Sequence, residues 1–208
     1  MSITITIIII IITAIISISA FSNVQLFDKL KLFPAVMNSS KESYRIASYA
    51  LIHADFLHLA VNMYVLYNFG SGTEEIFSIA FGTKGVFFFI LLYIGGIITS
   101  VIPSYEKHKG NFGYTAVGAS GAVSAIVFSF ILFNPLAIFN FLFIPFDIPA
   151  YVFGVFYLGI SYYLAQQNKG NIGHDAHFFG ALFGIMFTIL LDKNIAVRFV
   201  EILKDHWS

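Results

Sequence analysis

Long runs of apolar residues, separated by shorter polar segments, dominate the pattern along this chain. A membrane-spanning helix needs about 17–25 mostly apolar residues. Six runs approach or reach that length, and we predict a helix in each: residues 3–21, 54–72, 85–102, 115–133, 150–165 and 173–191. The first run has no preceding Lys or Arg, which a secretory signal peptide requires, so we predict that it is a helix of the bundle.

Two connecting segments also have an informative pattern. The connector over residues 22–53 is long, and between residues 24 and 33 its apolar positions alternate with charged ones. Such a pattern is typical of a short element that lies on the bilayer surface. The segment 136–148 is apolar but contains Pro145 and Asp147, so we predict an interfacial connector and not a seventh helix.

The composition fits a protein that lives in a membrane. Of 208 residues, 58% are hydrophobic and 11% are charged, whereas soluble domains have about 25% charged residues. So few charges cannot cover a water-facing surface. No repeat or linker divides the sequence, and we predict one all-α, multi-pass integral membrane domain over residues 1–208.

Charge and cysteine content exclude several classes of function. The 11 basic and 11 acidic residues balance without a basic run, so nucleic acid is not an expected partner. The chain has no cysteine, which excludes disulfides, a thiolate nucleophile and a cysteine-based metal site. The His-Glu-x-x-His motif of metalloproteases is missing, and His174 and His177 are the nearest approach to a ligand cluster. We expect neither a metal nor another cofactor.

Polar residues inside the predicted helices are the most informative, because polar groups are costly in lipid and by default mark function. His58 and Asn62 are one helical turn apart and share a face of the second predicted helix. Ser120 lies in the fourth predicted helix and His177 in the sixth. Taken singly, Ser120 suits helix packing, Asn62 an interhelical hydrogen bond, and His177 a proton relay or a ligand contact. Together they provide a nucleophile, a base and an amide donor.

Ser120 and His177 are the residue types of a nucleophile and its general base. A serine hydroxyl becomes nucleophilic when a neutral imidazole takes its proton, which requires hydrogen-bond contact. Two helices reach that contact only where small residues let their backbones approach. The two predicted helices have such residues near the polar pair: Gly118, Gly121, Gly180 and Gly184.

Acyl transfer also needs donors for the negative charge that develops on the substrate oxygen. The side-chain amide of Asn62 and the ring of His58 can donate. The backbone N–H of Ser120 can donate as well if this residue begins its helix. No carboxylate within the predicted helices is placed to orient His177, so we expect a Ser/His dyad.

These residues resemble the motifs of the rhomboid intramembrane serine proteases. GASG at residues 118–121 is similar to the G-x-S-G nucleophile motif, and HLAVN at 58–62 matches H-x-x-x-N. AHFFGALFG at 176–184 is similar to A-H-x-x-G-x-x-x-G. The order and spacing of the three motifs agree, and the resemblance covers nearly the whole chain.

The resemblance implies a six-helix enzyme that cleaves the transmembrane segments of other membrane proteins. It implies catalytic roles for Ser120 and His177, and a lateral gate formed by the fifth helix and the loop before His177. It implies oxyanion or supporting roles for four further residues: Asn62, His58, Gly118 and Gly121. It implies structural roles for Arg45, Glu74, Gly180 and Gly184, and it likens His53 to a histidine that supports a loop.

Two features depart from the family pattern. Many relatives have an aromatic residue four positions after the catalytic serine, where its ring stacks on the catalytic histidine, but this chain has Ser124. Another side chain must then hold the imidazole. The family topology also implies a cell (inner) membrane with the site on the extracytoplasmic side. That topology puts seven basic residues outside and four inside, against the positive-inside rule.

Two alternatives to a protease stay open. One is an inactive relative that binds and escorts membrane proteins, although such proteins usually lose the serine or histidine that this chain keeps. The other is a small transporter with a relay through His58, Asn62 and His177. The sequence has no internal repeat and no acidic residue on the motif faces, which disfavours a transporter.

Overall fold

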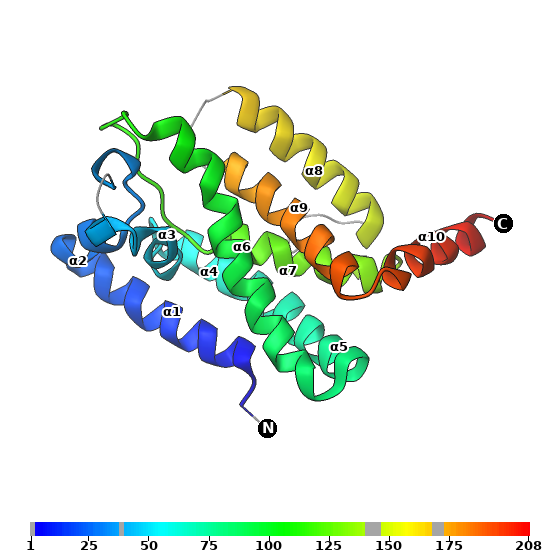
Figure 1. Ribbon diagram of the computed structural model, residues 1–208. Coiled ribbons are helices and arrows are strands. Elements are labelled where there is room, and N and C mark those ends of the chain that lie inside the picture. The colour runs from blue at the N-terminus through cyan, green and yellow to red at the C-terminus, as the bar shows by residue number, and fades with distance from the viewer. Residues whose placement is uncertain (1–2, 38–39, 140–146, 168–172) are drawn as a thin grey trace.

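The computed structural model describes residues 3–37, 40–139, 147–167 and 173–208, and most of these residues are helical (Figure 1). The longer helices are α1 (Ile5–Ser22), α6 (Gly85–His108), α7 (Ser120–Phe133), α8 (Ala150–Gln167), α9 (His174–Leu191) and α10 (Asn194–Trp207). One helical segment is built from α4 (Phe56–Val65), a π-helical turn η4 (Leu66–Gly70) and α5 (Ser71–Phe81). The all-α architecture predicted from the apolar runs is therefore confirmed.

Short elements connect the long helices. They are α2 (Val24–Leu30), α3 (Arg45–Ser48), the single turns η1 (Pro34–Val36), η2 (Ser40–Glu42), η3 (Tyr49–Leu51) and η5 (Gly82–Lys84), and the strands β1 (Ile138–Phe139) and β2 (Ile148–Pro149). The two strands pair antiparallel. The predicted connector over residues 136–148 is thus described only at its two ends, because residues 140–146 lie outside the described ranges.

Three helical stretches within the described ranges are long and apolar enough to cross a membrane: Ile5–Ser22, Phe56–His108 and His174–Leu191. The second has 53 residues. It turns at η5, where Gly82 has φ 58°, and α6 then packs against α5. The protein is an integral membrane protein, whereas the number of six crossings stays a prediction.

Three predicted boundaries differ from the structure by more than two residues. The third helix continues to His108 and does not end at residue 102. The fourth helix begins at Ser120 and not at residue 115, because Ala116 forms two backbone hydrogen bonds with Leu32 that keep this stretch extended. The second helix continues through Gly70 to Phe81, past the predicted end at residue 72.

Helix α10 was not predicted at all. It follows α9 at one end of the bundle (Figure 1), and its apolar residues Ile195 and Phe199 are one helical turn apart and face the core. At 14 residues it is too short to cross a membrane, so a search for long apolar runs passes over it.

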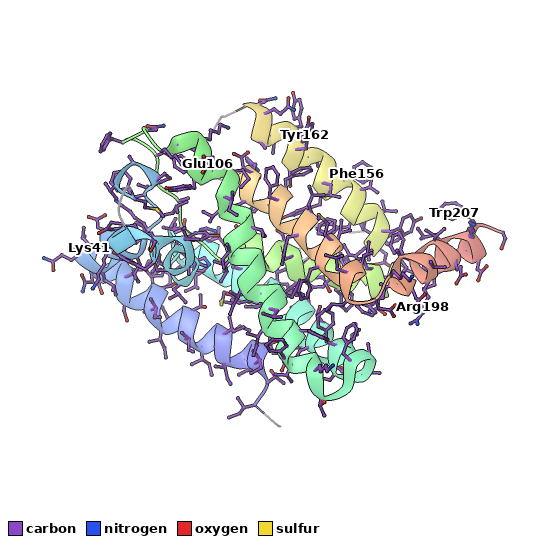
Figure 2. The ribbon with its side chains drawn as sticks, in the orientation of Figure 1. Lys41, Glu106, Phe156, Tyr162, Arg198 and Trp207 are labelled. Atoms are coloured by element: carbon purple, nitrogen blue, oxygen red, sulfur yellow. The ribbon has the colours of Figure 1, made fainter. Side chains whose placement is uncertain are left out.

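Helix α7 lies at the centre of the bundle, packed against α6, α8 and α9. Its buried residues are Gly121, Ala122, Val123, Ser124, Ala125, Ile126, Val127, Phe128, Ser129, Ile131 and Leu132. A helix surrounded by protein is apolar on all sides. The outer surface of α8 instead carries large aromatic side chains such as Phe156 and Tyr162 (Figure 2), which suits contact with lipid.

Two charged residues connect neighbouring elements at the periphery of the bundle. The Arg45 guanidinium pairs with Glu42 at 2.6 Å and donates to the carbonyl oxygens of Asp28 and Lys31, which ties α3 to the end of α2. The buried Glu74 carboxylate accepts two backbone N–H groups at the start of α1 and the hydroxyl of Thr6, at 2.7–2.9 Å. Glu74 therefore caps the positive end of α1 from α5.

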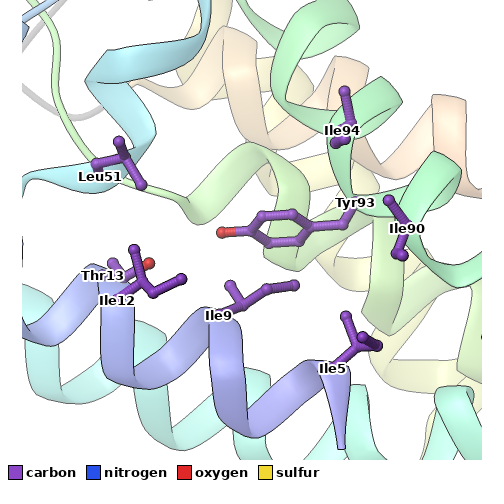
Figure 3. Close-up of a pocket in the computed structure, with 8 residues that line it drawn as sticks. All are labelled: Ile5, Ile9, Ile12, Thr13, Leu51, Ile90, Tyr93 and Ile94. Carbon is purple, nitrogen blue, oxygen red and sulfur yellow. The ribbon is translucent and has the colours of Figure 1, made fainter.

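A cavity of about 270 Å³ opens between α1 and α6 (Figure 3). Isoleucine side chains of both helices line it, together with Leu51 and the hydroxyl-bearing Thr13 and Tyr93. None of the candidate site residues lines this cavity.

Candidate functional site

Ser120 is the first residue of α7, and the chain enters it from an extended stretch. Gly118 in this stretch has φ 114° and donates its N–H to the carbonyl of Tyr49 at 3.0 Å. No side chain caps α7. The N–H groups of its first turn are therefore not used by capping, and they form the positive end of the helix.

Gly118 leaves room for the imidazole of His58. A Cβ atom at Gly118 would lie 2.7 Å from His58 Cε1 and 2.9 Å from His58 Nε2. The positive φ angle also disfavours any other residue at this position. The structure thus brings the His58 ring against the backbone two residues before Ser120.

His58 and Asn62 lie on α4, which begins just after Asp55. The Asp55 carboxylate accepts the backbone N–H of His58 at 2.7 Å and caps the helix. One N–H of the buried Asn62 amide donates to the carbonyl of His58 at 2.9 Å. Since an amide has two N–H groups, the second is the one that can serve a substrate.

A second histidine, His53, is fully buried beside the Ser120 turn. Its Nε2 accepts the backbone N–H of Ala119 at 3.4 Å, and its Nδ1 lies 3.0 Å from the Ser17 hydroxyl. Ser17 itself donates to the carbonyl of Leu51, so the proton of the neutral ring is assigned to Nδ1. His53 therefore holds the backbone immediately before Ser120 and needs to be neutral to do so.

The charge state of His53 makes stability depend on pH. Burial, with a smaller effect of His58, lowers the pKa of His53 from 6.5 to about 4, although Asp55 opposes the shift. Between these values the unfolded chain binds the proton and the folded protein does not. The stabilisation is therefore complete above pH 6.5 and is lost as the pH falls towards 4, at a cost of about 2–3 kcal/mol.

This dependence is measured by thermal unfolding in detergent at pH 7.5 and pH 5. The wild-type protein is expected to be less stable at pH 5, and His53→Gln, which does not titrate, is expected to show a smaller difference between the two pH values. An equal difference in both proteins would contradict the assignment of a neutral His53.

Contacts between α7 and α9 fix the position of His177 along the axis of α7. A Cβ atom at Gly180 would lie 3.0 Å from the Cα of Gly121, and one at Gly184 would lie 2.8 Å from the Cα of Ala125. Because both contacts advance by four residues, the two helices run parallel. His177 lies one turn before Gly180 and is near the start of α7, because the carbonyl oxygen of the preceding residue, Ala176, would lie 3.2 Å from a Cβ atom at Gly121, next to Ser120.

Within the described parts of the chain, the imidazole of His177 has two ring neighbours. The ring of His174 lies 6.0 Å away edge-on, and the ring of Tyr157 from α8 lies 6.1 Å away at an angle of 33°. Among the described residues no hydrogen bond joins Ser120 to His177; such bonds are often long in ligand-free enzymes and tighten with substrate. The nearby Asp175 pairs with Lys107 at 3.6 Å.

Tyr157 lies beside the candidate site residues but was not predicted from the sequence. Its ring lies near His177, as the ring four positions after the serine does in many relatives, and its hydroxyl is 2.5 Å from the Ser124 hydroxyl. Tyr157 is one of several tyrosines on α8, and no spacing within that helix distinguishes it. The sequence contained one clue. Ser124 stands where many relatives have an aromatic residue, so a ring beside His177 had to come from another helix.

Comparison with known proteins gives a consistent result. The model of the rhomboid domain matches residues 40–194, a range that contains all the candidate site residues. RHOMBOID-like protein 12, mitochondrial, from Arabidopsis thaliana is 30% identical over an alignment of 148 residues that covers 64% of this chain and 41% of that protein. This chain thus matches less than half the length of that relative. It belongs to the rhomboid family.

Proposed function

We propose that the protein is an intramembrane serine endopeptidase that cleaves the transmembrane segments of other membrane proteins. The observation that carries this proposal is the convergence of three helices on the start of α7. Ser120 begins that helix, the His58 ring of α4 lies against Gly118, and the contact of α9 with α7 brings His177 to the same end of α7.

The proposed reaction uses Ser120 and His177 as a dyad. The neutral imidazole of His177 takes the proton of Ser120 as its Oγ attacks the scissile carbonyl carbon. The imidazolium then gives this proton to the leaving amine, and an acyl-enzyme forms. Water attacks the acyl-enzyme in the second half of the reaction, with His177 again as the base, and this releases the new carboxylate.

Three groups can stabilise the oxyanion in this reaction. They are the backbone N–H of Ser120 at the positive end of α7, the free N–H of Asn62 and a ring N–H of His58. The absence of side chains at Gly118 and Gly121 lets the His58 ring and helix α9 approach the start of α7 closely. A single donor of this kind typically contributes about 10²–10³ in kcat.

The length of α7 supports a recessed site. Its 14 residues extend for about 21 Å at 1.5 Å per residue, whereas the hydrocarbon core is about 30 Å thick. Ser120 then lies several ångströms below one bilayer surface. Polar groups are tolerated at that depth where they line a water-filled space, and water is needed for the second step.

The proposal extends to the surroundings of the site. Arg45 and Glu74 hold the first loop and α1 in place, and Gly180 and Gly184 allow the close contact of α7 with α9. A substrate helix enters laterally past α8, and the site opens to the extracytoplasmic side of the inner membrane. These assignments rest on the resemblance and on the contacts described above.

Labelling with a fluorophosphonate tests the proposed activity. This reagent reacts with an activated serine, so the purified wild-type protein is expected to be labelled at Ser120 and the Ser120→Ala variant to show no label. The matched control is Ser19→Ala on the exposed face of α1, which is expected to label normally. A wild-type protein that binds a transmembrane substrate but neither labels nor cleaves it would instead be an inactive escort.

A further inference from the structure

The hydroxyl of Tyr157 connects α8 to the first turn of α7. Ser124 Oγ lies 2.8 Å from the carbonyl oxygen of Ser120 and 2.5 Å from the Tyr157 hydroxyl. A serine hydroxyl has a single proton, and the carbonyl can only accept one. Ser124 therefore donates to the carbonyl oxygen of Ser120 and accepts from Tyr157, which gives a chain of two hydrogen bonds that ends on the backbone of the residue with the proposed nucleophile.

The ring of the same side chain limits the position of His177. It lies 6.1 Å from the imidazole, and its own position is fixed by Phe128 and Phe153, each with a ring centre 5.5 Å away. Tyr157 thus contacts Phe128 of α7, Phe153 of its own helix α8 and the proposed base on α9. No other described aromatic residue combines a hydrogen bond towards Ser120 with a ring contact to His177.

We propose that Tyr157 is a positioning residue for both members of the dyad, and that it makes their geometry depend on the packing of α8. The inference rests on the proposed protease function. The ring confines the imidazole, and the hydroxyl holds the start of α7 through Ser124. Because both contacts come from one side chain, a displacement of α8 removes both at once.

A cycle of single and double variants tests the hydrogen bond. Tyr157→Phe keeps the ring and breaks the hydrogen bond between residues 157 and 124. Ser124→Ala breaks the same bond and also the bond to the carbonyl oxygen of Ser120. Each is expected to lower kcat for cleavage of a model transmembrane substrate, and the rate of fluorophosphonate labelling, by about 10-fold. The double variant is expected to lose no more than Ser124→Ala alone, because that single variant already breaks both hydrogen bonds. KM is expected to change by less than twofold.

The control is Tyr163→Phe, which removes the hydroxyl of an exposed tyrosine on the same helix; it is expected to keep wild-type kcat. Losses that multiply in the double variant, or wild-type kcat in both single variants, would overturn the inference. These outcomes differ from failure of the proposed function, in which the wild-type protein itself neither cleaves nor labels.

A rescue experiment tests the ring. Tyr157→Ala is expected to lower kcat by about 100-fold, and its thermal unfolding is measured to separate this loss from unfolding. Adding Ser124→Tyr to this variant restores a ring at the position used by many relatives, next to the space vacated by residue 157. Recovery of kcat by about 10-fold is expected. A folded double variant without recovery would overturn the role of the ring.

Discussion

Replacement of His177 by glutamine is expected to lower kcat for cleavage by about 10⁴-fold or more, since loss of the base in a serine protease removes nearly all of its catalysis. Glutamine has a similar polar end but cannot take a proton from Ser120. The donors at the start of α7 stay in place, so a small residual rate is expected from oxyanion stabilisation alone. The measurement is single-turnover cleavage of a transmembrane substrate in proteoliposomes.

His206 provides the control for this replacement. It is an exposed histidine on α10, and His206→Gln is expected to cleave and label at the wild-type rate. If His177→Gln were labelled by a fluorophosphonate as fast as the wild-type protein, Ser120 would have another base and the dyad would be wrong.

The second large effect is expected at the contact between α7 and α9. Gly180→Ala adds a methyl group that meets the backbone of Gly121, with its Cα only 3.0 Å away. Backbone cannot rotate aside as a flexible side chain can, so the two helices must separate. We expect the free energy of unfolding to fall by about 1–3 kcal/mol and cleavage to fall further, because Gly121 is bonded to Ser120.

Gly159 in the middle of α8 is the matched position, because nothing lies within 4 Å of a Cβ atom there. Gly159→Ala is expected to be neutral or to stabilise the protein by about 0.5–1 kcal/mol, as alanine favours a helix. Denaturant titration of both variants in mixed micelles compares them. Equal stability of the two variants would show that the close contact does not hold the helices together.

Features that depend on neighbours along one helix could be predicted from the sequence. The apolar runs predict most of the helices, and the spacing of four residues predicts that His58 and Asn62 share a face. The same spacing predicts that Gly180 and Gly184 form one contact surface with α7. In each case the physical cause is the helical repeat itself.

Features that depend on distant segments could not be predicted in this way. Residues 115–119 are small and apolar, and they have the pattern of a helix. The segment is extended because Ala116 pairs with Leu32, more than 80 residues earlier in the chain, and because Gly118 has a positive φ angle. Periodicity contains no information about such a pairing. The sequence alone therefore did not determine whether the helix begins at Ser120 or several residues earlier.

The charge distribution is easier to understand with the structure. Of the basic residues predicted outside, Lys31, Arg45, Lys107 and Lys109 each form an ion pair with a nearby carboxylate. Lys169 lies outside the described ranges. Paired charges serve local structure, which offers a reason for their presence on that side. The orientation of the protein in the membrane stays a prediction.

The segment before Ser120 has a practical consequence for engineering. Three backbone hydrogen bonds attach it to the first loop: two between Leu32 and Ala116, and one from Gly118 to Tyr49. An insertion between residues 32 and 49 would therefore change the position of the serine although it lies far away in the sequence. The exposed end of α10 at Trp207 has no such connection, which makes it the better place for an affinity tag or a fluorescent label.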